Sequence, residues 1–266
     1  MEGAFIHLRI PKEHGAWAML YTPFAAGLAV SRSFSWALPL LLAAVTCLFI
    51  GRDSLLAWGR ARSRGEPSGP ALRETAFMLG LALACGIVAA LVWRLPGLLW
   101  MGLTALLLLG VNFSQVVRRE HRALEAEILG VVGLTLTAPA AYYAARGRWD
   151  AAALWLWLLS ALCFASSIFY VRLRVLSPQP RKDQARQDLR VRSMAYHAFL
   201  VVVLGWFALT GRRHALAVLG FLPILGRTAW SLWRPSSSLD LRRIGILEIV
   251  YSVNFLVFIA LAFSRG

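Results

Sequence analysis

Charged side chains are scarce in this sequence, at 15% of 266 residues, whereas a soluble domain carries about 25%. Hydrophobic residues reach 59%, and the mean hydropathy is +0.63. A chain of this composition lacks the polar surface that a water-soluble fold exposes, which excludes a soluble globular domain. The sequence therefore predicts an integral membrane protein whose apolar side chains face lipid.

Acidic residues and cysteines are also few. The 13 acids stand against 28 Lys and Arg, which gives a formal net charge of +15. Basic loops between membrane helices account for this balance, so we predict no nucleic-acid partner. The three cysteines lie inside apolar runs without a CxxC pair or a Cys/His ligand spacing, which excludes a disulfide framework. The N-terminal stretch MEGAFIHLRIPKEHG has no uninterrupted apolar segment, so we expect no cleaved signal peptide.

What the sequence does contain is a series of long apolar runs. A membrane-spanning helix needs about 20 such residues, and the four shortest runs are expected to extend into their flanks. No soluble domain fits between the runs, so residues 1–266 are predicted to form one all-α membrane bundle of about nine spanning helices. The runs are Ala16–Val30, Trp36–Ile50, Leu72–Trp93, Leu98–Val117, Ile128–Ala145, Ala151–Val171, Tyr196–Thr210, Ala215–Trp230 and Ile244–Phe263.

The basic residues fix an orientation for these nine runs. When every Lys and Arg is assigned to its nearest helix end, 21 fall on the side of the N-terminus and 7 on the other side. Cytoplasmic loops of membrane proteins carry the excess of Lys and Arg. We therefore predict that the N-terminus lies in the cytoplasm and the C-terminus outside.

Polar side chains gather at the predicted cytoplasmic ends of the runs, which predicts a functional pocket open to the cytoplasm. In the second run, Asp53, Arg60 and Arg64 share one face if that helix continues past Gly51. Arginine there would bind phosphate as a bidentate fork or contact anionic lipid headgroups. We prefer the lipid role for Arg62 and Arg64 and leave both roles open for Arg52. The other polar residues at these ends are His14, Asn112, Arg118, Arg119, Arg172, Tyr196 and His197.

Two ionisable residues suggest proton handling. His14 lies where a helix enters the bilayer and fits a proton carrier or a structural hydrogen bond. Glu248 lies a turn inside the last run, with Tyr251 on the same face. A carboxylate at this depth faces the bundle interior, where it fits either an ion pair with an arginine of another helix or a ligand contact.

The chain resembles the UbiA-type intramembrane prenyltransferases in its nine helices and its long second and sixth cytoplasmic loops. "YTPFAAGLAV" is similar to the first helix of that family, and "VVRREHRALEAEILGVVGLTLTAPAAYYAA" to its fourth-to-fifth helix passage, with the basic pair at Arg118 and Arg119. This resemblance implies a pocket for an isoprenyl diphosphate, reached through a lateral opening. The segments "PKEHGAWAML", "FYVRLRV", "AYH" and "IGILEIVYS" are more closely similar to the YwiC-like family of bacterial membrane proteins, which implies the bacterial cytoplasmic membrane.

The acidic motifs of the prenyltransferases are not kept. Their first motif, Asn-Asp-x-x-Asp-x-x-x-Asp, falls on Arg52, Asp53, Leu56 and Arg60, and the end of the sixth run carries Arg172 and Arg174. Because Mg²⁺ needs oxygen ligands, this pattern argues against the usual Mg²⁺ site, and the cofactor stays open.

The leading hypothesis is a UbiA-like protein that binds an isoprenoid-like lipid or prenyl diphosphate, with prenyl transfer, if it occurs, lacking the usual metal site. In that hypothesis Arg52, Asn112, Arg118, Arg119, Arg172, Tyr196, His197 and Tyr251 bind substrate, and His14, Asp53 and Glu248 handle protons. The alternative is a non-catalytic accessory protein that binds quinone or lipid. A transporter is less favoured because the two halves of the chain show no repeat.

Overall fold

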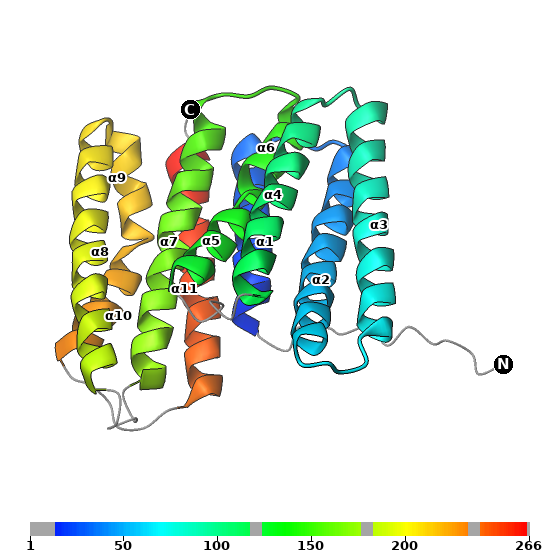
Figure 1. Cartoon of the computed structure of the whole chain (residues 1–266). Coiled ribbons are helices and arrows are strands. Elements are labelled where there is room, and N and C mark those ends of the chain that lie inside the picture. Colours follow the sequence, from blue (N-terminus) through cyan, green and yellow to red (C-terminus); the bar gives the residue numbers. More distant parts are fainter. Residues whose placement is uncertain (1–13, 118–123, 177–182, 234–239, 265–266) are drawn as a thin grey trace.

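The computed structural model describes residues 14–117, 124–176, 183–233 and 240–264, all of them in helices or short connections (Figure 1). Apolar runs without internal breakers form helices because a helix satisfies its own backbone hydrogen bonds in lipid. The helices are α1 (His14–Ser31), α2 (Ala37–Ser63), α3 (Gly69–Val92), α4 (Gly97–Val117), α5 (Leu124–Thr135), α6 (Thr137–Arg146), α7 (Ala151–Leu176), α8 (Asp183–Leu209), α9 (Arg212–Leu219), α10 (Leu222–Trp233) and α11 (Leu241–Ser264).

These helices cross the bundle in nine passes, because α5 with α6 and α9 with α10 each form one interrupted pass. Within the described ranges, eight passes are long and apolar enough to span a membrane, which confirms a multi-pass membrane protein. The shorter α1, with 18 residues, is not among the eight, so its crossing stays a prediction. The second run extends to Ser63 and the seventh begins at Asp183, as expected for runs that looked too short.

The centre of the bundle is the crossing of α1 and α6. Every residue from Thr137 to Ala144 of α6 is buried. A Cβ on Gly27 of α1 would lie 2.2 Å from the carbonyl oxygen of Ala138, so the two backbones touch because residue 27 has no side chain. The largest buried cluster extends from this crossing onto α7, α8 and α11 and includes Tyr142, Leu156 and Phe255.

The break between α5 and α6 lies inside the bundle, where unpaired backbone carbonyls are costly. Side chains satisfy several of them. The Thr137 hydroxyl lies 2.9 Å from the Leu134 carbonyl and 2.9 Å from the Leu20 carbonyl of α1. The Trp157 Nε1–H donates to the Val132 carbonyl at 3.1 Å. The sequence analysis treated this pass as one continuous run and did not foresee the break.

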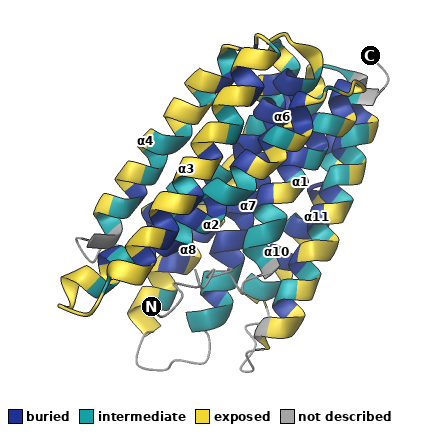
Figure 2. Ribbon diagram, turned by 90° about the vertical axis from the view of Figure 1, so that its right-hand side faces the viewer, coloured by how far each residue is buried: buried dark blue, intermediate teal, exposed yellow. Residues whose placement is uncertain are grey.

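On the side of the bundle formed by α3 and α4, other helices cover less of the surface. The long faces of α3 and α4 are largely exposed (Figure 2), and their exposed residues are mainly apolar, including Leu83, Leu91, Leu103 and Leu107. Such faces suit contact with lipid chains. α2 and α3 form the most extensively packed pair of helices, whereas α4 leans on α2 and α5 and leaves a cleft.

Candidate functional site

The cleft lies between α2, α3, α4 and the α5–α6 pass and has a volume of about 360 Å³. Its wall is made almost entirely of aliphatic side chains, such as Leu48 of α2 and Leu106 of α4. The polar residues among its lining are Thr137, whose hydroxyl is bonded to backbone, and the pair Arg52 and Asn112. From Leu41 to Arg52 the cleft follows α2 for about 16 Å at 1.5 Å per residue. It is therefore an elongated apolar space with one polar end.

Four helical glycines widen this cleft. Gly86 of α3, Gly102 of α4, and Gly130 and Gly133 of α5 all line it. A Cβ on Gly86 or Gly102 would meet no atom within 4 Å, and on Gly130 or Gly133 it would meet its nearest neighbour at 3.7 Å. Close helix packing therefore does not require these glycines, although glycine in a helix costs about 1 kcal/mol relative to alanine. They leave room in the cleft that larger side chains would fill.

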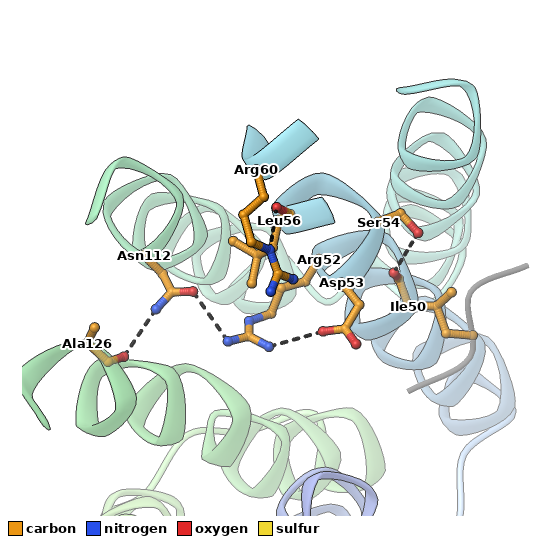
Figure 3. Close-up of polar contacts among 8 residues, drawn as sticks. All are labelled: Ile50, Arg52, Asp53, Ser54, Leu56, Arg60, Asn112 and Ala126. Atoms are coloured by element: carbon orange, nitrogen blue, oxygen red, sulfur yellow. Dashed lines mark hydrogen bonds and ion pairs between the residues drawn. The ribbon is translucent and has the colours of Figure 1, made fainter. Parts of the chain in front are cut away.

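The polar end is built from three helices (Figure 3). The Arg52 guanidinium donates from Nη2 to Asn112 Oδ1 at 3.3 Å and from Nη1 to Asp53 Oδ1 at 3.4 Å. Asn112 Nδ2 donates in turn to the Ala126 carbonyl of α5 at 3.1 Å. Asn112 is 6% exposed, and its side-chain oxygen and nitrogen are both engaged, so it holds α4, α5 and the guanidinium together.

The bonds of Arg52 described above are longer than those of Arg172, another arginine that was predicted to bind substrate. Hydrogen bonds between guanidinium and carboxylate are normally about 2.7–2.9 Å, and both bonds of Arg52 described above are longer. Arg172 instead forms a bidentate pair with Glu127 of α5, at 2.7 and 2.9 Å. Arg172 therefore already holds a carboxylate, whereas Arg52 lies in the cleft lining with longer bonds to Asp53 and Asn112.

A second polar cluster lies in the other half of the bundle, around Arg227 of α10. Its side chain is 4% exposed and forms an ion pair with Glu248 of α11. Nη2 of the Arg227 guanidinium also donates to the Ser167 hydroxyl at 3.3 Å. The guanidinium carbon lies 4.3 Å from the ring centre of Tyr170 and 4.8 Å from that of Tyr251. A buried cation is tolerated here because a carboxylate and two aromatic faces compensate it.

His197 and Tyr196 of α8 belong to the neighbourhood of this cluster. His197 Nδ1 lies 2.7 Å from the Ser193 carbonyl, which only accepts, so Nδ1 carries the proton. Nε2 then accepts from the Ser166 hydroxyl at 2.8 Å. The Tyr196 hydroxyl donates to the Leu162 carbonyl at 2.5 Å. Ser166 is bonded to His197, and Ser167 is bonded to Arg227. Because the two serines are adjacent on α7, His197 and Arg227 bind neighbouring residues of the same helix.

The structure separates residues that the sequence analysis placed in one pocket. Arg52 and Asn112 line the cleft, whereas Glu248 and Tyr251 contact Arg227 and are not among the cleft's lining residues. Arg172 is occupied by Glu127. For Glu248, the ion pair was one of two open interpretations, and the structure confirms the pair. The side chain of His14 and the whole of Arg118 and Arg119 lie outside the described residues.

Arg227 is the residue that sequence reasoning missed. It was counted only among the basic residues at the end of its run, although it lies inside the apolar helix Leu222–Trp233. A signal was available, because an arginine inside an apolar run requires a partner and Glu248 was an unpartnered acid in the last run. Pairing the two would have identified the contact between α10 and α11.

The residues at the polar end do not fit Mg²⁺. Asp53 is bonded to Arg52, and at the matching end of α7 the side chain is Arg172, already paired with Glu127. A guanidinium beside the single carboxylate opposes a divalent cation and favours an anion. Among the described residues, no three His, Cys, Asp or Glu side chains lie together as a metal-binding group.

Comparisons with known proteins identify relatives. The family model described as "YwiC-like protein" matches residues 10–143. A protein of Bacillus subtilis (strain 168) described as "Uncharacterized protein YwiC" is 29% identical over 256 residues, which covers 96% of this chain and 98% of that protein. Among solved structures, none matches the chain significantly.

Proposed function

The chain belongs to the YwiC-like protein family, and we propose that it binds an isoprenoid-like lipid with an anionic head in the bacterial cytoplasmic membrane. The observation that carries the proposal is the apolar cleft of about 360 Å³ that ends at Arg52 and Asn112. An aliphatic tail suits the leucine-rich wall, and a phosphate, diphosphate or carboxylate suits the guanidinium.

The charge at the polar end supports an anionic rather than a neutral head. Arg52 is half-buried, with 27% of its side chain exposed, so its charge is incompletely solvated. The Asp53 carboxylate lies 3.4 Å from Nη1 of Arg52, which is longer than a normal charge-assisted bond. A phosphate would give shorter, charge-assisted bonds to both terminal nitrogens. The UbiA-like arrangement and a cytoplasmic N-terminus, which would open this end toward the cytoplasm, are part of the same proposal.

Two roles for the bound lipid are compatible with this cleft. In the first, the protein transfers a prenyl group from it; in the second, the protein is a non-catalytic accessory protein that only binds lipid or quinone. One observation favours the second role: Glu248, one of the three residues predicted to handle protons, is bonded to Arg227 rather than placed in the cleft. In the catalytic role, Arg52 would stabilise a departing diphosphate, and Asp53 is the carboxylate bonded to Arg52. Incubation with a labelled prenyl diphosphate and an aromatic acceptor distinguishes the two roles, since only a transferase yields a new prenylated product.

Binding of farnesyl diphosphate to the purified protein in nanodiscs tests the proposal. We expect Arg52→Ala to weaken binding by about tenfold or more, the effect of losing a hydrogen bond to a charged group. Arg62→Ala is the matched control, because Arg62 lies on the same helix with its guanidinium against Trp58 and outside the cleft lining. Each variant is measured with Mg²⁺ and with EDTA. Equal affinity of wild type and Arg52→Ala would contradict the anion site.

A further inference from the structure

Gly130 of α5 lies directly opposite the Arg52 guanidinium. A Cβ on Gly130 would come 3.7 Å from Arg52 Nη2 and would meet no other atom within 4 Å. This differs from Gly27, where a Cβ would overlap the Ala138 carbonyl and close packing explains the glycine. At Gly130 the missing side chain serves no contact between helices. The absence of a side chain at position 130 leaves space beside the Arg52 guanidinium.

That space is bounded by groups already on the polar end of the cleft. Ala126 lies one turn before Gly130 on α5, and its carbonyl accepts from Asn112. Asn112 Oδ1 accepts from Nη2 of Arg52, the same nitrogen that faces Gly130. An anionic oxygen that approaches Arg52 along α5 therefore passes over Gly130, while Asn112 closes the side toward α4.

We infer that Gly130 sets the size of the head group that reaches Arg52. The inference rests on the proposed lipid-binding function and narrows its ligand to a compact anion, such as a phosphate, diphosphate or carboxylate at the end of an apolar chain. A side chain at position 130 would occupy the volume that the anion needs. The apolar part of the cleft, along Leu48 and Leu106, would stay open to a tail.

Gly133 provides the matched control one turn farther along α5. A Cβ there would contact Leu108 at 3.7 and 3.8 Å, so a larger residue narrows the tail region rather than the polar end. Both glycines occupy the same helix face, so both substitutions change the helix backbone to a similar degree. Only position 130 adjoins Arg52.

The experiment compares wild type, Gly130→Val and Gly133→Val in nanodiscs with two probes, farnesyl diphosphate and farnesol. We expect Gly130→Val to weaken diphosphate binding by about tenfold or more, as the bond to Arg52 is lost, with farnesol binding unchanged. Gly133→Val should weaken both probes. If Gly130→Val does not fold, as judged by thermal melting, Gly130→Ala replaces it and should weaken diphosphate binding selectively by a smaller factor.

The outcomes separate this inference from the function on which it rests. Wild type that binds neither probe overturns the proposed function itself. Wild type that binds diphosphate through Arg52, with a folded Gly130 variant that binds it equally well, overturns the role of Gly130 alone. A Gly130 variant that loses farnesol to the same extent as diphosphate also overturns it, because the substitution would then block the tail.

Discussion

Arg227 shows how much a single residue can determine inside this bundle. Its ion pair with Glu248, its bond to Ser167 and its two tyrosine neighbours connect α10, α11 and α7. A buried pair is costly to desolvate, so its net contribution to stability is small, but breaking it leaves one uncompensated charge. The pair therefore fixes which helices meet more than it raises stability.

Glu248→Leu alone should lower the free energy of unfolding by about 3–5 kcal/mol, because Arg227 then keeps a buried charge without its carboxylate. The double variant Arg227→Met with Glu248→Leu should recover most of the loss, since no charge remains buried. Thermal melting of the detergent-purified protein measures both. Arg186→Ala, which breaks an exposed pair with Asp183, is the control and should change stability by less than about 1 kcal/mol. A double variant as unstable as the single one would show that the packing of Arg227, not its charge, matters.

At the scale of helices, α1 and α6 cross closely at Gly27, where an added Cβ would meet another backbone at a shorter distance than at the other glycines described. Gly27→Ala should destabilise the protein by about 1–3 kcal/mol, the usual cost of overpacking, because its Cβ would lie 2.2 Å from a carbonyl oxygen that cannot move within its helix. Gly80→Ala on α3 is matched to it, since a Cβ there meets nothing within 4 Å. That control should melt at or above the wild-type temperature. Equal melting of the two variants would contradict the close crossing.

The helices were largely predictable from the sequence, while their interruptions and contacts were not. Apolar runs gave all nine passes, because length and hydropathy are local properties of the chain. The break before Thr137 depends on partners from α1 and α7, the Leu20 carbonyl and Trp157, which no local pattern contains. The residues of the candidate site were likewise predictable in part, and their arrangement was not. Arg52 and Asn112 were identified by their residue types at helix ends, but their separation from Glu248 depends on how distant helices pack.

For the whole molecule, orientation in the membrane decides on which side the polar end of the cleft opens. Short connections such as 32–36 and 93–96 join the helices at one end of the bundle, and α2 turns into α3 at the other (Figure 1). In the sequence, the basic residues are divided 21 to 7 between the two sets of helix ends, which predicts that the side of the α2–α3 turn faces the cytoplasm. Arg52 lies past the middle of α2, and its partner Asn112 lies near the end of α4 that is on the basic side. The polar end should therefore be accessible from the cytoplasm.

Reporter fusions test this orientation and, at the same time, whether α1 crosses the membrane. Eight passes qualify as spans by length and composition, and eight crossings alone would place both ends of the chain on the same side. If α1 is the ninth, an N-terminal green fluorescent protein should fluoresce in the cytoplasm, and a C-terminal alkaline phosphatase should be active outside. A phosphatase fused after residue 236, in the predicted cytoplasmic connection before α11, should be inactive and serves as the control. A phosphatase that is active after residue 236 and inactive at the C-terminus, beside a cytoplasmic N-terminus, would mean that α1 does not cross.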